Sequence, residues 1–219
     1  MKAGHLLRAV FTDPTGSVSP SLYETARLVA LAPWLAGHAD RRHYLLAQQD
    51  PDGWWGPQRG HRLVPTLSAV EALLTSLSRG DWPAAERTRA AAAADAGIAA
   101  LLSADGDDRL LPDTVAHELI IPDLVGRINA QLAHHRPEYR LTLPAGLSPD
   151  LPERLRRKVE AAGTVPLKLQ HSFEAFADAS TAPLIPDAPA LVGSSPAATA
   201  AWIALRGGPD RCPGRARAL

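Results

Sequence analysis

The sequence predicts an all-α fold. Apolar residues recur three and four positions apart through most of the 219 residues, and Ala and Leu are abundant. Ser and Asp residues stand where helices should begin, and alternating strand patterns are hard to find. These observations together favour a domain built only from helices.

The helices can be placed in order from their start signals and apolar stripes. Ser21-x-x-Glu24 is a capping box, and Pro33 should end the helix that it opens. Pro65 suits a first helical position, and Ser195-Pro196 combines an N-cap with a proline at N1. We expect helices over about 3–11, 21–32, 41–49, 65–77, 81–102, 113–133, 150–161, 166–177 and from 195 onward, with Asp81, Asp113 and Asp150 as caps and loops over 13–17, 105–108 and 180–193.

Composition excludes several classes of protein. Lys plus Arg and Asp plus Glu balance at 23 each, which argues against nucleic-acid binding. The single cysteine, Cys212, cannot form an internal disulfide, so a thiol-reducing cytoplasm is expected. No apolar run reaches the roughly 18–20 residues of a transmembrane helix. Hydrophobic residues make up 46% of the chain, enough for a substantial core.

One short motif joins two of the expected helices. Residues 49–56 contain Gln49, Asp52, Gly53 and Trp55 in the pattern Gln-x-x-Asp-Gly-x-Trp-Gly. We expect Gln49 to satisfy carbonyls at a helix end, Asp52-Gly53 to form a tight turn and a tryptophan ring to stack over the junction. We call residues 49–56 the clasp and predict a structural role for it.

The clasp resembles the Gln-Trp motif of triterpene and class II diterpene cyclases, and further landmarks follow in that family's order. They are Ser19-Pro-Ser-Leu-Tyr23-Glu24-Thr25-Ala26, Arg62-Leu-Val-Pro-Thr66-Leu67-Ser68-Ala69, Thr114-Val-Ala-His117-Glu118-Leu-Ile-Ile-Pro122, His171-Ser172-Phe173-Glu174 and Ser194-Ser195-Pro196-Ala-Ala-Thr199-Ala200. Over about 5–205 the chain is similar to the N-terminal part of a bacterial class II diterpene cyclase of the copalyl diphosphate synthase type.

The resemblance implies an α/α-barrel-type γ domain over 1–206. The family's β domain, which carries the Asp-x-Asp-Asp acid that protonates the terminal alkene of geranylgeranyl diphosphate, would follow. A carboxyl group in a desolvated site is a strong enough acid to protonate the alkene carbon when its anti proton is held in a hydrogen bond. We therefore expect no catalytic residue in this chain and no activity from it alone.

A literal Asp-x-Asp-Asp occurs at Asp105-Gly106-Asp107-Asp108. It lies between two expected helices and precedes His117-Glu118, whereas the family's acid comes well after Ser195-Pro196. A solvated loop gives ordinary carboxyl pKa values, so we interpret it as a polar inter-helix loop, with a weak cation site as the alternative.

Arg62 and His61 are the candidate substrate-binding residues. In related enzymes acidic residues often precede the corresponding arginine and are associated with magnesium and diphosphate; here Gly60-His61 stands there, which weakens a metal role. Arg62 either contacts diphosphate oxygens or forms a salt bridge at the helix entry. Mg²⁺ is expected only in the complete enzyme, and no cofactor or metal is predicted for this chain.

Other polar residues favour structural roles. Glu118 is expected to pair with His171 or Arg127, and Glu174 to lie on a solvated face or make a packing contact. His134-His135 lacks a third zinc ligand, and Cys212 lacks a base that would activate it.

Residues 207–219 lose the apolar period and are rich in Gly, Pro and Arg, which predicts a disordered tail. Two alternatives to a catalytic fragment stay open. One is a free helical domain that docks a separately encoded β domain, and the other is a gene product truncated by a shifted reading frame. The cyclised product and the substrate chain length are not encoded in any motif here.

Overall fold

The computed structural model describes residues 20–57, 61–104, 111, 114–188 and 190–219. Within these ranges every regular element is a helix, which confirms the predicted all-α class. The α-helices are α2 (Leu22–Leu31), α3 (His38–Ala47), α4 (Leu63–Arg79), α5 (Ala84–Ser103), α6 (His117–His135), α7 (Leu151–Ala162), α8 (Leu167–Gln170), α9 (Pro196–Leu205) and α10 (Pro213–Ala218), with short 3₁₀ turns η3 (Phe173–Ala175), η4 (Ala182–Leu184), η5 (Val192–Ser194) and η6 (Pro209–Arg211).

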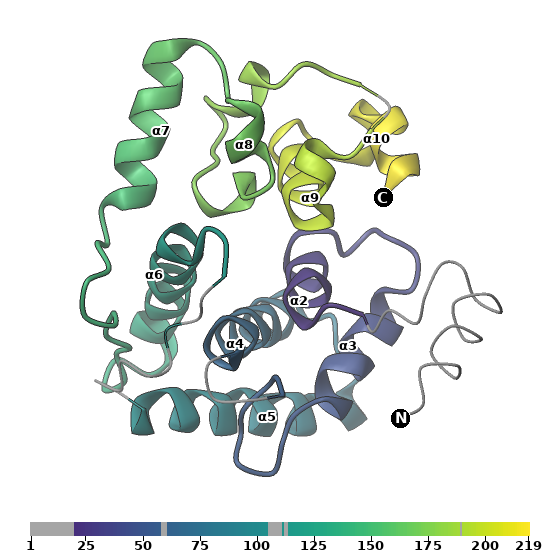
Figure 1. The fold of residues 1–219 in the computed structure, drawn as a ribbon. Coiled ribbons are helices and arrows are strands. Elements are labelled where there is room, and N and C mark those ends of the chain that lie inside the picture. The colour runs from purple at the N-terminus through teal and green to yellow at the C-terminus, as the bar shows by residue number, and fades with distance from the viewer. Residues whose placement is uncertain (1–19, 58–60, 105–110, 112–113, 189) are drawn as a thin grey trace, which may run out of the picture.

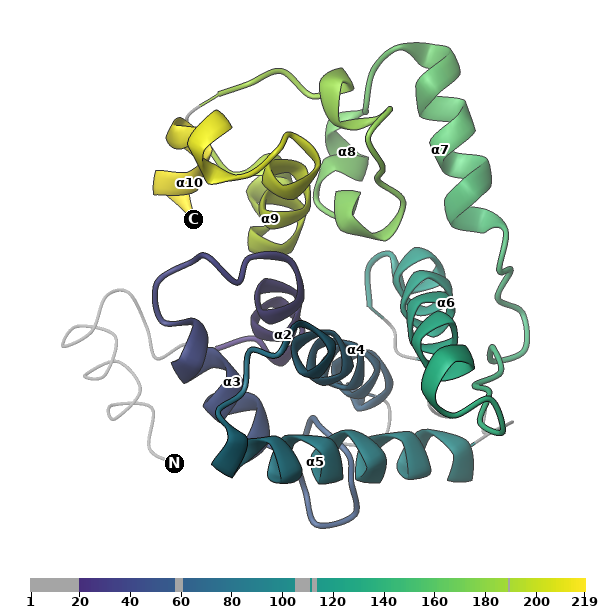
Figure 2. The same cartoon turned by 180° about the vertical axis from the view of Figure 1, so that it is seen from behind.

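The helices form two groups that meet at α2 (Figure 1). In the first group α2, α4 and α6 lie above α5, which runs across beneath them, and α3 flanks α2 (Figures 1 and 2). The second group contains α7 to α10, and α9 packs directly against α2. Each group has its own cluster of buried apolar side chains. Leu31 at the end of α2 packs against both clusters, so α2 connects them.

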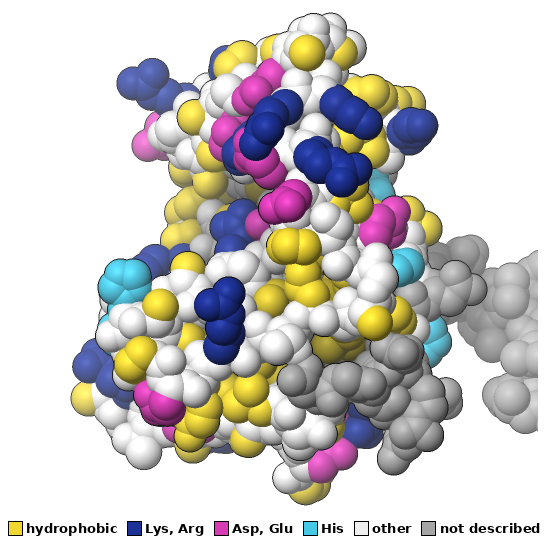
Figure 3. Space-filling model, turned by 90° about the vertical axis from the view of Figure 1, so that its left-hand side faces the viewer, with side chains coloured by type: hydrophobic (Ala, Val, Ile, Leu, Met, Phe, Trp, Pro, Cys, Tyr) yellow, Lys and Arg dark blue, Asp and Glu magenta, His cyan; other side chains and the backbone are white. Residues whose placement is uncertain are grey.

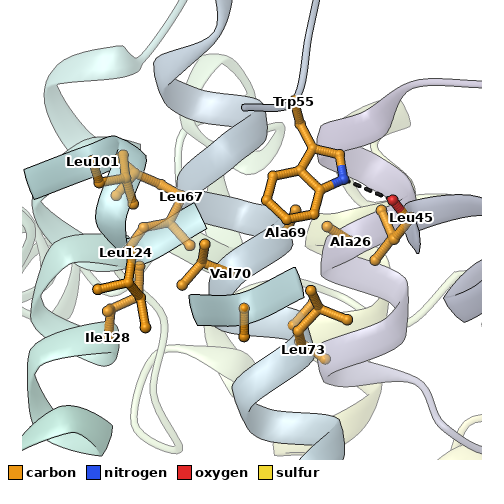
Figure 4. Close-up of a cluster of buried hydrophobic side chains, with 14 of the residues drawn as sticks. Ala26, Leu45, Trp55, Leu67, Ala69, Val70, Leu73, Leu101, Leu124 and Ile128 are labelled. Atoms are coloured by element: carbon orange, nitrogen blue, oxygen red, sulfur yellow. Dashed lines mark hydrogen bonds between the residues drawn. The ribbon is translucent and has the colours of Figure 1, made fainter. Parts of the chain in front are cut away.

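Helix α4 is the centre of the first group because its sequence is apolar or small on nearly every side. Leu67, Val70 and Leu73 are fully buried and pack with Leu124 and Ile128 of α6 (Figure 4). The one carboxylate on α4, Glu71, is also buried and accepts a hydrogen bond from the guanidinium of Arg27 on α2 at 2.7 Å. Such a pair satisfies two charges that would be very costly to bury separately.

Two of the expected caps are confirmed by side-chain hydrogen bonds. The Ser21 hydroxyl accepts from the backbone N–H of Glu24, and the Ser195 hydroxyl accepts from that of Ala198. Pro196 occupies N1 of α9, as predicted. Helix α2 ends at Leu31, two residues before Pro33.

Other expected helix starts are wrong. Pro65 is the third residue of α4 rather than its first, because the helix already begins at Leu63. Asp81 does not cap α5, which begins at Ala84 after Pro83; its carboxylate is held by Arg79 and His38 instead. By contrast, Asp150 is the N-cap residue of α7, as expected, although its side chain makes no capping hydrogen bond. The expected helix over 166–177 is two short pieces, α8 and η3.

The expected disorder of residues 207–219 is also wrong, since they form η6 and α10. Arg215 is buried, donates to the carbonyls of Ala190 and Pro186, and lies 4.4 Å from the centre of the Trp202 ring. Cys212 is buried in the second cluster. An Arg-rich composition suggested a solvated segment, but a long guanidinium side chain can also cover an aromatic ring. The expectations for 3–11, 13–17, 105–108 and Asp113 lie outside the described residues.

Candidate functional site

The clasp holds the end of α3 to the start of α4 and to the middle of α5. The indole N–H of Trp55 donates to the carbonyl of Leu45 at 2.7 Å (Figure 4). Gln49 donates to Gly53 at 3.1 Å and to Ala93 of α5 at 2.9 Å. These hydrogen bonds join α3, the clasp and α5, but the last-turn carbonyl of α3 is satisfied by Trp55 rather than by Gln49.

The clasp approaches α5 closely enough to require glycine at two positions. Gly53 has φ +88°, and a Cβ there would lie 2.4 Å from the carbonyl oxygen of Ala96. A Cβ on Gly97 of α5 would lie 2.8 Å from the Trp55 ring and 2.5 Å from Val70. The close contact therefore depends on a glycine on each side, Gly53 in the turn of the clasp and Gly97 on the facing helix α5.

Arg62 completes the clasp. Its guanidinium binds Asp50 at 2.8 Å and Asp52 at 2.9 Å, and its Nε donates to the carbonyl of Gly56 at 3.2 Å. All three guanidinium nitrogens are therefore engaged inside this loop. His61, its neighbour in sequence, lines a cavity instead, so the structure places the two candidate substrate-binding residues in different surroundings.

The cavity that His61 lines has a volume of about 390 Å³ and a mainly apolar wall. It lies between the first turns of α2, α4 and α6 and the segment that precedes η3. A concave, largely apolar site with a few polar groups is the usual form of a small-molecule site. Its described lining residues are Tyr23, Glu24, His61, Val64, Pro65, Thr114, Val115, Ile120, His171, Ser172 and Glu174.

Two polar side chains in this wall, Tyr23 and Glu174, are hydrogen-bonded to each other. The Tyr23 hydroxyl donates to Oε1 of Glu174 at 2.5 Å, and Glu174 is 2% exposed. Burial raises the pKa of Glu174 to about 7 and also raises the pKa of Tyr23. Oε2 of Glu174 has no hydrogen-bond partner among the described residues. The cavity therefore holds a carboxyl group that is partly protonated at neutral pH.

Glu24 lines the same cavity and joins the two groups of helices. Its carboxylate accepts from the backbone N–H of Ala197 at 2.6 Å and from the hydroxyl of Ser195 at 3.2 Å. Burial raises the pKa of Glu24 despite these hydrogen bonds. The capping box is therefore half formed: Ser21 caps α2, whereas the Glu24 side chain caps α9 across the interface.

The expected pairing of Glu118 with His171 or Arg127 is wrong. Glu118 is half exposed and forms an ion pair with His117, while Arg127 pairs with Asp123 one turn earlier on α6. Of the two alternatives for Glu174, a solvated face or a packing contact, its burial excludes the first. Tyr23 and Glu174 both belong to family landmarks, but no sequence pattern pairs them, because 151 residues separate them in the chain.

The remaining polar candidates fall elsewhere. His134 bonds to the Ala130 carbonyl of its own helix. Within the described ranges no group of three or more His, Cys, Asp or Glu side chains is arranged to hold a metal ion. None of the described helices is long and apolar enough to cross a membrane. Asp105–Asp108 lies outside the described residues.

Comparisons with known proteins agree with the helical architecture. No protein-family model matches the chain. It is 44% identical to a copalyl diphosphate synthase from Streptomyces anulatus over 90% of this chain and 38% of that protein. It is 41% identical to a labda-7,13-dienyl diphosphate synthase from Streptomyces clavuligerus over 99% of this chain and 43% of that protein. The structure of an ent-copalyl diphosphate synthase from Streptomyces platensis superposes with a TM-score of 0.71 at 40% identity, covering 99% of this chain and 45% of that one.

The chain spans about two fifths of the length of the curated relatives it matches.

Proposed function

Since this chain is a homologue of the copalyl diphosphate synthases, we propose that it is the γ-domain part of a class II diterpene cyclase and forms one wall of the pocket for geranylgeranyl diphosphate. The observation that carries the proposal is the mainly apolar cavity of about 390 Å³ at the first turns of α2, α4 and α6. Its size and lining suit part of a polyprenyl chain.

The described residues supply binding rather than acid chemistry. Val64 and Ile120 hold the hydrocarbon and exclude water from it. Protonation of an alkene needs an acid much stronger than a carboxyl group whose pKa is about 7, so Glu174 is unsuited to that step. The acid is therefore proposed to come from the part of the complete enzyme that this chain does not match.

The diphosphate would be held at the His61 end of the cavity. The three nitrogens of Arg62 are already bonded within the clasp, so this residue would act by fixing the loop that carries His61 unless it exchanges a partner. The described lining offers no group of carboxylates suited to Mg²⁺. Mg²⁺ is proposed only for the complete enzyme, and no step is assigned to it here.

The test is incubation of the purified chain with geranylgeranyl diphosphate. We expect no cyclic diphosphate from the chain alone and recovery of cyclisation when the complementary segment of the Streptomyces anulatus relative is added. The proposal would be overturned if the chain alone cyclised the substrate and if Asp107→Asn or Asp108→Asn abolished that activity.

A second candidate, a non-catalytic partner that docks a separate β-domain protein, is supported by exposed apolar residues near the cavity. Val115 is 76% exposed, and Leu167, four residues before His171, is 77% exposed. In Figure 3 the charged side chains of α7 gather at the top of one face, whereas hydrophobic side chains are numerous below. Exposed apolar patches often mark interfaces.

The mixture of this chain with the complementary segment of the Streptomyces anulatus relative also distinguishes the two candidates, because co-elution and cyclisation are measured separately. Val115→Glu with Leu167→Glu should abolish co-elution with the complementary segment. Tyr139→Glu is the matched control, because Tyr139 is 40% exposed and does not line the cavity. Co-elution without recovered cyclisation would favour the non-catalytic partner; cyclisation would favour the cyclase.

A further inference from the structure

One wall of the cavity rests on a turn that does not itself line the cavity. This wall segment contains His171, Ser172 and Glu174, all three of which line the cavity. Behind it lies η5, which packs against α8 just before the wall segment, and none of the η5 residues lines the cavity. The wall segment therefore has open space on one side and packed backbone on the other.

The contact between η5 and the wall segment requires glycine at position 193. Gly193 has φ +54° and the next residue, Ser194, has φ +59°, so the chain turns sharply here. A Cβ on Gly193 would lie 2.5 Å from the Cα of His171 and from the carbonyl carbon of Gln170, and closer still to the backbone nitrogen of His171. Because these neighbours are backbone atoms, a methyl group at position 193 would have to move one of the two chain segments.

Of these two segments, η5 is the more firmly held. The backbone N–H of Val192 donates to the hydroxyl of Thr199 on α9 at 2.8 Å, and Val192 is buried in the second cluster. Ser195, which follows η5 directly, caps α9. His171, by contrast, is exposed and borders the cavity. A side chain at position 193 would therefore move His171 toward the cavity, because close-packed groups yield less than open space does.

From this geometry we propose that Gly193 determines the length of prenyl chain that the cavity accepts, because it lets the wall segment lie back against η5. This inference rests on the proposed function, in which the cavity holds part of a polyprenyl chain. Gly193 is a positioning residue, since it contacts the backbone of His171 and does not line the cavity. A side chain at position 193 narrows a cavity of about 390 Å³, and the longer hydrocarbon, which needs more of that volume, loses more affinity.

The test is calorimetric titration of the full 219-residue chain with geranyl diphosphate and with geranylgeranyl diphosphate. The two probes share the diphosphate, so the ratio of their dissociation constants reports on the hydrocarbon. We expect the unaltered chain to bind geranylgeranyl diphosphate tighter. Gly193→Ala should reduce this preference by about 10-fold, the scale on which an apolar pocket distinguishes one methylene group. A general loss of structure would instead weaken both probes alike.

Gly163→Ala is the matched control for backbone strain. Gly163 also has a positive φ, +66°, but a Cβ there meets nothing within 4 Å. This variant should keep the length preference of the unaltered chain. An unchanged preference in Gly193→Ala, or an equal fall in Gly163→Ala, would overturn this inference and leave the proposed function standing. Equal binding of the two probes by the unaltered chain would overturn both.

Hydrogen exchange on the unaltered chain tests the same contact even if Gly193→Ala does not fold. A prenyl chain that fills the cavity holds the wall segment against η5, so geranylgeranyl diphosphate should slow exchange at the backbone N–H of Val192 as well as in the wall segment. Exchange in η6, which is also remote from the lining, should not change. Slowing that is confined to residues that line the cavity would overturn the inference.

Discussion

At the scale of single residues, burial changes the chemistry of acids that the sequence alone presents as ordinary. Glu174 follows His171-Ser172-Phe173 in a segment that sequence patterns assigned to a helix, and nothing local marks it as buried. Its environment comes from Tyr23, which lies 151 positions away. Residue types and landmarks were predictable, whereas pKa values depend on contacts between distant segments.

The raised pKa of Glu174 predicts a pH dependence of stability. Its usual pKa of 4.5 applies to the unfolded chain and a pKa of about 7 to the folded chain. Between these two pH values the folded chain keeps a proton on Glu174 that the unfolded chain has lost. Stability from this group is fully present below pH 4.5 and is lost as the pH rises through 7, by about 3 kcal/mol at ~1.36 kcal/mol per unit.

Urea unfolding of the unaltered chain and of Glu174→Gln at pH 4.5 and pH 8 measures this contribution of Glu174 to the free energy of unfolding. The unaltered chain should lose about 3 kcal/mol more than the variant over that interval. Glu24 and Asp123, whose pKa values burial also raises, contribute to both proteins and cancel in the difference. Parallel stability curves would contradict the assignment.

At the scale of elements, the helices were predictable where apolar stripes are long, and their ends were less so. The stripe of leucines predicted helix α4, but the helix begins at Leu63, two residues before Pro65. The hydroxyl of Thr66 in its first turn accepts from the backbone N–H of Trp55 in the clasp, a contact that no local pattern reveals. The same limitation applies to Asp81, whose pairing with Arg79 and His38 no local pattern reveals. Element existence follows from periodicity, whereas element ends depend on tertiary contacts.

The contact between the clasp and α5 predicts opposite effects for two similar substitutions. Gly97→Ala would place a methyl group 2.5 Å from Val70 and 2.8 Å from Trp55, and overpacking of this kind costs about 1–3 kcal/mol. Gly126→Ala on α6 meets nothing within 4 Å and should gain about 0.5–1 kcal/mol from helix propensity. Thermal unfolding should therefore show a lower midpoint for the first variant and a higher one for the second. Equal midpoints would contradict this close packing.

At the scale of the whole molecule, two apolar clusters are coupled through α2. Apolar patterning predicted enough hydrophobic residues for a core, but it did not predict that they divide into two clusters. The division depends on which helices face each other, and α2 faces both α4 and α9. Glu24 bridges this junction, so a residue predicted to cap its own helix instead connects the two clusters.

Glu24→Ala should therefore loosen α9 more than it loosens α4 or α5. The substitution leaves the backbone N–H of Ala197 and the hydroxyl of Ser195 without their acceptor, which costs about 1–3 kcal/mol when such groups are buried. Ser21→Ala is the matched control, because it removes the cap of α2 and touches nothing on α9. Hydrogen exchange should quicken across α9 in Glu24→Ala and only at the start of α2 in Ser21→Ala. Uniform quickening in both variants would mean that the two clusters unfold as one unit and that Glu24 is not the coupling between them.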